Sequence, residues 1–146
     1  MQAEGLPALP APSAPAIRAL PPVSDWVSVR SLGAKGDNSS DDTAAIQKAI
    51  DSHRVVYLPT GFYKVSDTLR LRADTVLLGL HPSLTQIVLP DGAPAWQGVG
   101  APKALVESAQ GGDAIVAGLG LNSNGANPRA TALLWMAGAN SMVNDV

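Results

Sequence analysis

The chain has 146 residues, a length typical of a single domain. Ten Lys and Arg residues against twelve Asp and Glu residues give a formal net charge of −2, which excludes a broadly basic surface of the kind that binds nucleic acid. Cysteine is absent, so disulfides, thiolate metal sites and a cysteine nucleophile are excluded as well.

The N-terminal segment is dominated by two residue types, because residues 1–22 contain six Pro and six Ala. Proline fixes φ and lacks an N–H donor, so residues 1–24 are predicted to form an extended, poorly ordered arm or linker. The start of the chain lacks the basic segment and continuous apolar core of a secretory signal. No apolar stretch is long enough to cross a bilayer, so we expect no membrane partner.

Residues 26–52 are predicted to form a short strand, a tight turn and one helix. Residues 26–31 alternate in the manner of a strand, and Gly33 and Gly36 bracket a turn that favours positive φ. The polar run 38–42 supplies N-cap candidates for a helix over residues 42–52. That helix has one apolar face, formed by Ile46, Ala49, Ile50 and His53.

Short strands without intervening helices are predicted from residue 55 onward. They are expected at 55–58, 62–65, 68–71, 76–80 and 86–89. Two to five turn residues separate them, which does not fit alternating strands and helices but fits a solenoid of stacked coils.

The remainder of the chain is predicted to continue the solenoid after one protrusion. Residues 91–110 are rich in Gly, Pro and Ala, which predicts a protruding loop, and residues 113–122 alternate as a strand. Two last strands are expected at 132–136 and 141–146. No capping element follows them, so we expect a truncated solenoid that associates through its last coil or is marginally stable.

The segment 28–79 carries a specific set of spacings, SVRSLGAKGDNSSDDTAAIQKAIDSHRVVYLPTGFYKVSDTLRLRADTVLLG. It resembles the opening of the pectate-lyase-type right-handed parallel β-helix superfamily, which includes polygalacturonases, rhamnogalacturonases, pectate lyases, alginate epimerases and phage tailspikes. The resemblance implies a mainly β fold in which residues 25–146 form the N-terminal coils with a capping α-helix.

The resemblance also implies a function and a location. It implies a polysaccharide partner, no cofactor, and a glycoside hydrolase or polysaccharide lyase that is extracellular or periplasmic. The segment 135–146 is similar to a coil of laminarinase-like members and slightly favours a glycoside hydrolase. The alternative is a structural or carbohydrate-adhesive β-helix, such as a phage tailspike-type module, since superfamily members share the fold and differ in chemistry. The oligomeric state stays open.

Two polar motifs are interpreted as structural. The segment 33–37, Gly-Ala-Lys-Gly-Asp, lacks the ending of a phosphate-binding loop, and acidic residues follow it. Asp37, Asp41 and Asp42 lack the spacing of a calcium loop, so they are predicted to cap and order the turn. We therefore predict no metal site.

Three residues are candidates for substrate binding. Trp96 offers a ring on which a sugar can stack, although a Trp in a loop also serves as an anchor packed on the wall. Asn122 and Asn124 can bind sugar hydroxyls, or alternatively hydrogen-bond the backbone of a turn. Asp113 and Asp145 are not assigned, because nothing in the sequence places them together as an acid and base pair. The resemblance places the catalytic residues downstream of Val146, so this chain alone is expected to be inactive.

Overall fold

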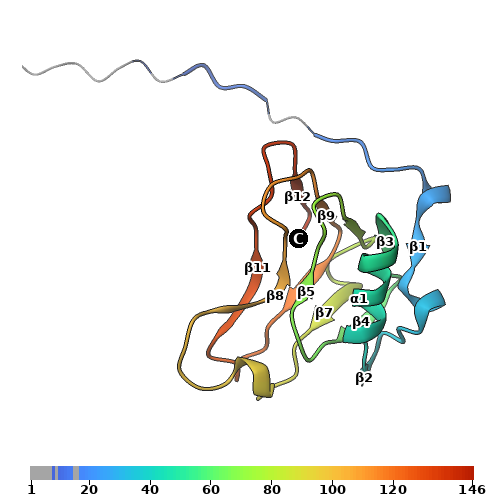
Figure 1. Cartoon of the computed structure of the whole chain (residues 1–146), viewed down its shortest axis with the longest axis vertical. Helices are drawn as coiled ribbons and strands as arrows, with labels where there is room; N and C mark the ends of the chain where they lie inside the picture. Colours follow the sequence, from blue (N-terminus) through green and yellow to red (C-terminus); the bar gives the residue numbers. More distant parts are fainter. Residues whose placement is uncertain (1–7, 9, 15–16) are drawn as a thin grey trace, which may run out of the picture.

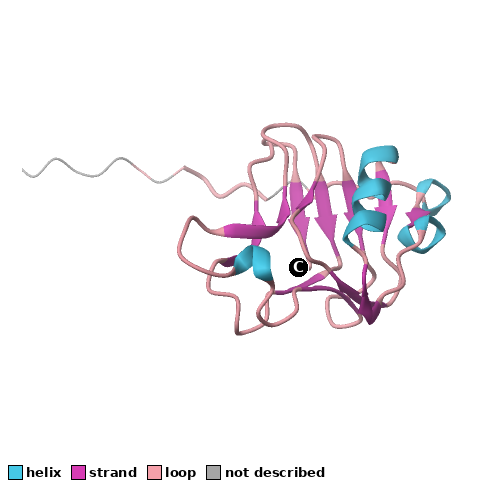
Figure 2. Ribbon diagram, turned by 60° about the horizontal axis from the view of Figure 1, so that its bottom comes forward, coloured by secondary structure: helices cyan, strands magenta, loops and turns pink. Residues whose placement is uncertain are grey.

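Short parallel strands stacked in three sheets form the body of the chain (Figures 1 and 2). The computed structural model describes residue 8, residues 10–14 and residues 17–146. Sheet A contains β1 (Val27–Ser28), β3 (Val55–Tyr57), β6 (Val76–Leu78), β9 (Ile115–Ala117) and β12 (Met142–Asn144). Sheet B contains β2 (Asp37–Asp41), β4 (Gly61–Lys64), β7 (Thr85–Val88) and β10 (Gly120–Asn122). Sheet C contains β5 (Leu69–Arg70), β8 (Lys103–Glu107) and β11 (Ala130–Leu134).

From β3 onward, each coil passes from sheet A to sheet B to sheet C and returns to sheet A one level further on. All pairings between neighbouring coils are parallel. Residues at matching positions therefore stack, and Val56, Leu77 and Val116 lie in one row of the main core. These strands bury their inward side chains completely, which supplies the apolar driving force. The right-handed parallel β-helix predicted from the sequence is confirmed.

Helix α1 (Thr43–Ser52) closes the first coil, where Figure 2 shows it at one end of the stack. Ile46, Ala49 and Ile50 are fully buried, as the helical spacing predicts. Asp42 orders the turn before the helix, as predicted, although it does not cap the helix. The Asp42 carboxylate makes no capping bond but accepts from the backbone N–H groups of Lys35 and Gly36 at 2.8 and 2.9 Å.

Three predicted elements differ from the structure near the N-terminus. The strand predicted at 26–31 is only β1, because 3₁₀ helix η2 (Val29–Leu32) follows directly and ends at Gly33, with φ at 104°. A further 3₁₀ helix, η1 (Val23–Asp25), precedes β1. Most of the polar run 38–42, interpreted as N-cap candidates, belongs to strand β2, which pairs with β4 across a register shift. Its polar side chains are tolerated because it is the outermost strand of sheet B.

Two further predicted elements differ from the structure in the segment between β7 and β11. The loop predicted at 91–110 contains 3₁₀ helix η3 (Pro94–Trp96) and the whole of β8, whose three buried apolar residues are consecutive and do not alternate with polar ones. The single strand predicted at 113–122 is two strands, β9 and β10. The break lies at Gly118, whose φ of 68° turns the chain from sheet A into sheet B.

The described end of the predicted arm lies against the solenoid rather than apart from it. Arg18 donates to the carbonyl oxygens of Asp113 and Asn140, which precede β9 and β12. At the other end of the segment, Trp26 packs on Tyr57 of β3, with ring centroids 5.3 Å apart. Four strands span about 14 Å, which residues 18–26 cross easily. The rest of the predicted arm lies largely outside the described residues.

This arrangement explains why the outer face of sheet A is apolar. A second hydrophobic cluster lies there, with Trp26, Tyr57 and Met142 packed at its border. No member of the cluster is more than 5% exposed, and the members are Val55, Val76, Leu78, Ile115 and Ala117. Residues 18–26 run across this face from the starts of β9 and β12 back to β3.

The opposite end of the stack has open strand edges. In the part of the chain that the structure describes, β10, β11 and β12 each have a strand neighbour on one side only. Leu134, Met136 and Val143 are exposed there, at 43%, 39% and 42%. Unpaired backbone beside apolar side chains promotes pairing with another chain.

The isolated chain is therefore expected to self-associate as its concentration rises, as light scattering over a concentration series will show. Replacing Val143 with lysine should suppress this association, because an edge charge must be desolvated on pairing. The control Val99→Lys, at a fully exposed loop position, should leave it unchanged. A wild-type monomer at every concentration would contradict the prediction.

Candidate functional site

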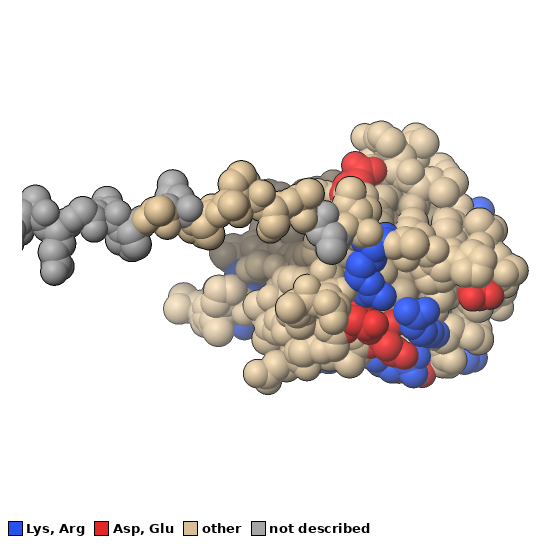
Figure 3. Space-filling model, turned by 90° about the horizontal axis from the view of Figure 1, so that it is seen from above, with Lys and Arg blue, Asp and Glu red and all other residues tan. Residues whose placement is uncertain are grey.

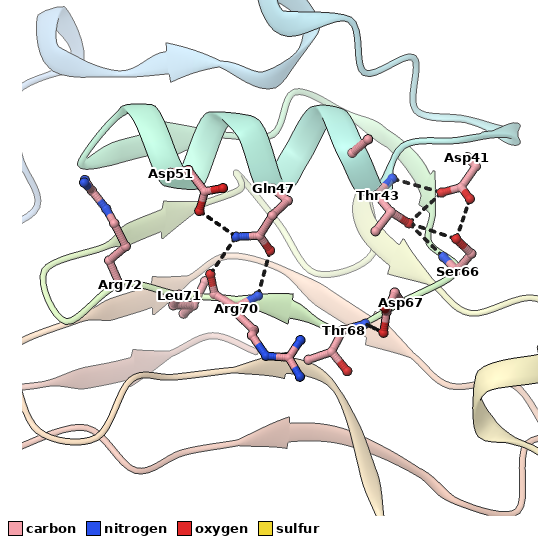
Figure 4. A pocket seen from close by; sticks show the side chains of 11 residues that line it. Asp41, Thr43, Gln47, Asp51, Ser66, Asp67, Thr68, Arg70, Leu71 and Arg72 are labelled. Carbon is pink, nitrogen blue, oxygen red and sulfur yellow. Dashed lines mark hydrogen bonds between the residues drawn. The ribbon is translucent and has the colours of Figure 1, made fainter.

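Two surface grooves contain Asp41, Asn122 and Asn124, three of the polar residues that sequence analysis singled out. The larger, which we call the helix groove, has a volume of about 880 Å³ and lies between α1 and β5 (Figure 4). The smaller, which we call the sheet B groove, has a volume of about 340 Å³ and lies on the outer face of sheet B. The two grooves differ in how their polar groups are engaged.

The polar groups of the helix groove bond mainly to one another. Gln47 donates to Asp51 at 2.9 Å and exchanges two hydrogen bonds with the backbone of Arg70, at 2.9 and 3.0 Å. The side chain of Gln47 thus ties α1 to β5. Asp41 accepts from the backbone N–H of Thr43 at 3.0 Å and from the Ser66 hydroxyl, as Figure 4 shows. These bonds fix the capping helix on the first coil.

Two carboxylates of the helix groove, those of Asp41 and Asp67, are held in their ionised form. The hydrogen bond from Lys103, at 2.7 Å, and the Thr68 backbone N–H lower the pKa of Asp67. Burial acts to raise the pKa of Asp41, but hydrogen bonds from Ser66 and Thr43 outweigh it and lower the pKa. A general acid in glycoside hydrolysis needs a raised pKa. Neither residue is suited to donate a proton at neutral pH.

Acidification is expected to destabilise the fold through three carboxylates whose pKa values are lowered in the folded chain. Two backbone N–H groups, from Ser40 and Ser39, lower the pKa of Asp37 to about 2, and the pKa values of Asp41 and Asp67 are lowered too. The unfolded chain binds protons at a higher pH than the folded chain does. The stability that these groups contribute is therefore complete above about pH 5 and is lost as pH falls toward 2. Melting temperatures between pH 7 and pH 2.5 will show the decline, and a constant value would contradict it.

The structure places Trp96 in the core and not on the surface. Its side chain is fully buried, and its indole N–H donates to the carbonyl oxygen of Lys103 at 2.9 Å. The Lys103 ammonium lies 5.2 Å from the ring centroid and covers one side of it. No ring face is open to a sugar, so this geometry fits the alternative of a loop anchor. The burial of Trp96 could not be predicted from the sequence, because it depends on β8 returning beneath the loop.

The structure brings Asn122 and Asn124 together in the sheet B groove. Asn122 Oδ1 accepts from the backbone N–H of Asn124 at 3.0 Å, and Asn124 Nδ2 donates to the carbonyl oxygen of Leu89 at 2.7 Å. Each side chain thus orders the turn after β10 and also lines the groove. The structural and binding interpretations of these residues are compatible, and binding stays a prediction.

Sequence analysis missed Phe62 as a site residue. Strand β4 alternates, so that Tyr63 is buried in the core while Phe62 is 43% exposed on the outer face. The other walls of the sheet B groove are mostly amides, a lysine and small apolar groups. The lining residues are Asn38, Phe62, Lys64, Gln86, Val88, Pro90, Asn122 and Asn124. Period-two alternation in residues 61–65 is the signal that identifies Phe62.

The remaining acidic candidates do not form a pair. Asp113 faces Arg18 with 3.5 Å between the charged atoms, and Asp145 is exposed with a φ of 53°. Over the described residues, no three His, Cys, Asp or Glu side chains are grouped so as to hold a metal ion. Among the same residues, no helix is both long and apolar enough to span a membrane. Figure 3 shows acidic and basic side chains lying next to one another on the face seen from above.

The fold and its capping helix match a known family. A sequence model of rhamnogalacturonase A/epimerase, pectate lyase-like proteins matches residues 26–144. The chain belongs to this family.

Individual relatives of this pectate lyase-like chain differ in what they do. The pre-neck appendage protein of Bacillus phage phi29 is 49% identical over 53 residues, covering 36% of this chain and 6% of that protein. The mannuronan C5-epimerase AlgE3 of Azotobacter vinelandii is 40% identical over 76 residues, covering 44% of this chain and 4% of that protein.

A solved structure shows the same architecture. The A-module of the Azotobacter vinelandii mannuronan C-5 epimerase AlgE4 matches with a TM-score of 0.55 and 31% identity. The match covers 74% of this chain and 31% of that one. The chain therefore spans less than a tenth of the two curated relatives and about a third of this structure.

Proposed function

We propose that the chain forms the first coils of a polysaccharide-active protein, a glycoside hydrolase or polysaccharide lyase that works outside the cytoplasm. The family match over residues 26–144 is the observation that carries this proposal. The similarity to epimerases named for a polysaccharide supports the substrate class. In this proposal residues 25–146 are the N-terminal part of the β-helix domain, and residues 1–24 are an arm.

The chemistry of the described residues supports a binding role for these coils and a catalytic centre elsewhere in the protein. Asp41 and Asp67 have lowered pKa values, which suits hydrogen-bond acceptors and not acid catalysts. Asp113 is engaged with Arg18. We therefore propose that cleavage needs groups beyond residue 146.

A screen for reaction products tests this proposal. The full-length protein is incubated with β-glucan, pectin and alginate; new reducing ends report hydrolysis, and unsaturated sugar ends report lyase activity. We expect one of these from the full-length protein and neither from residues 1–146. Product release by residues 1–146 that Asp113→Ala abolishes would contradict the proposed location of the catalytic centre. If the full-length protein released no product from any of the polymers, the proposed hydrolase or lyase activity would be contradicted.

A second candidate function is that of a structural or adhesive β-helix module. The phage pre-neck appendage protein favours it, because it is the more identical of the two curated relatives over its aligned segment, at 49% against 40%. Binding of the full-length protein to a polysaccharide surface without any product would distinguish this candidate from the enzyme.

A further inference from the structure

We propose that the sheet B groove is a binding site for a saccharide chain, with Phe62 as its stacking platform. The inference rests on the polysaccharide partner proposed above and names the surface that contacts it. It concerns binding alone and assigns no catalytic role to the groove.

The strand register explains why the side chains of the groove converge. Phe62 of β4 pairs with Gln86 of β7, and one row further along Lys64 pairs with Val88, which pairs with Asn122 of β10. Neighbouring strands lie about 4.8 Å apart, and alternate residues on a strand about 6.6 Å apart. The outward side chains therefore form a grid about the size of one or two sugar rings. Rigid stacked strands hold this grid in place before any ligand arrives.

The floor and walls of the groove combine the two kinds of group that a sugar needs. Sugar rings present apolar C–H faces, which pack on an aromatic ring, and equatorial hydroxyls, which need donors and acceptors in the ring plane. Phe62 and Val88 supply the apolar surface. Among the described residues, Phe62 is the most exposed Phe, Tyr or Trp side chain. Gln86, Asn122 and Asn124 supply amides at its border.

The amides retain bonding capacity for a ligand, in contrast to the helix groove. Among the described residues, Gln86 makes no side-chain hydrogen bond, and Asn38 makes none either. Asn122 uses only its oxygen, which leaves both N–H donors of its amide, and Asn124 uses only its nitrogen, which leaves its oxygen as an acceptor. A sugar hydroxyl can therefore accept a hydrogen bond from the amide N–H of Asn122 and donate one to the amide oxygen of Asn124.

The groove continues past Gln86 toward the turn that precedes β7. A second hollow of about 450 Å³ shares Gln86 and Asn122 with it and is bordered by Ser83 and Ser123. Gly120 lines the second hollow, where an added Cβ would lie 2.3 Å from the carbonyl oxygen of Pro82 and 2.8 Å from Cγ of Gln86. The glycine thus makes room for the Pro82 backbone and for the Gln86 side chain. A continuous path of this length suits a chain of sugars better than a single one.

The groove can accept either of two kinds of saccharide chain, one that carries uronate carboxylates and one that is neutral. Lys64 is the sole cation among the lining residues and can pair with the carboxylate of a uronate. Asp41 pairs with Lys64 in the register between β2 and β4, and the positive charge of Lys64 helps to lower its pKa. A neutral sugar chain would use the amides and Phe62 and leave this charge pair undisturbed.

Affinity electrophoresis of residues 1–146 on a neutral β-glucan, alginate and polygalacturonate tests the site. Phe62→Ala is expected to weaken binding by about 10-fold, the equivalent of one aromatic packing contact. Gln86→Ala should weaken it by about 5-fold, as expected for one hydrogen bond. Matched controls are Leu80→Ala, at an exposed apolar position, and Gln110→Ala, at an exposed glutamine outside the groove; both should bind like wild type.

Lys64→Met separates the two sources. A loss confined to the uronate polymers supports a carboxylate partner for Lys64, and unchanged binding to β-glucan alongside Phe62 dependence supports a neutral chain. Wild-type affinity for Phe62→Ala with a native melting temperature would overturn the site while leaving the polysaccharide partner in place. Absence of wild-type binding to all three polymers would overturn the site too, and the product screen of the full-length protein would then decide the proposed function independently.

Discussion

Replacing Gly118 with alanine is expected to destabilise the chain by about 4 kcal/mol or more, the range of the most damaging single substitutions. Gly118 turns the chain between β9 and β10, and its φ of 68° lies in the left-handed region that an L-residue avoids. An added Cβ would lie 2.3 Å from the carbonyl oxygen of Gly79 in the preceding coil. That neighbour is backbone, so it cannot rotate away, and the two coils must move apart.

A matched glycine separates the clash from the conformational strain. Gly92 has the same φ of 68°, but no atom lies within 4 Å of the position of its missing Cβ. Gly92→Ala should therefore cost about 1–2 kcal/mol, the strain alone. Chemical denaturation of both variants gives the difference in the free energy of unfolding. Equal losses in the two variants would show that the coils do not approach as closely at Gly118 as the structure requires.

Replacing Trp96 with alanine is expected to cost about 3–5 kcal/mol of unfolding free energy, as for other large buried aromatic residues. The side chain is fully buried and holds the loop between β7 and β8 onto the core, together with Ala93 and Leu105. Its removal also leaves the carbonyl oxygen of Lys103 without the indole donor. The loop should become sensitive to proteolysis, because its anchor is gone.

Two variants distinguish this anchoring role from sugar stacking. Trp96→Phe keeps most of the buried volume and should lose less stability than Trp96→Ala, and Val99→Ala, in the same loop but fully exposed, should lose none. Thermal melting and affinity electrophoresis are measured on the same samples. Native stability of Trp96→Ala together with a specific loss of polysaccharide binding would contradict the buried position of the ring.

The sheet B groove illustrates how far candidate site residues can be predicted from sequence. The sequence makes Asn122 and Asn124 candidates because their amides can contact sugar hydroxyls, and the structure places both in one groove. Phe62 lies beside them because β4 pairs with β7 and β7 pairs with β10. More than twenty residues separate β10 from each of the other two strands in the chain. Trp96 was singled out by the same chemistry, yet it lies in the core. Residue type indicates what a side chain can do, and packing decides whether it is available.

The sequence by itself determined the class of fold, the capping helix and several of the stacked strands. The apolar spacing of Ile46, Ala49 and Ile50 determines the capping helix, and short β-branched runs between turn residues determine stacked coils, because both patterns depend on local periodicity. Only the tertiary structure decided which surfaces are covered. Residues 18–26 lie over sheet A, and β8 returns beneath Trp96. These are contacts between segments far apart in the chain, and they form because buried apolar area stabilises any segment that can reach it, whatever its local pattern.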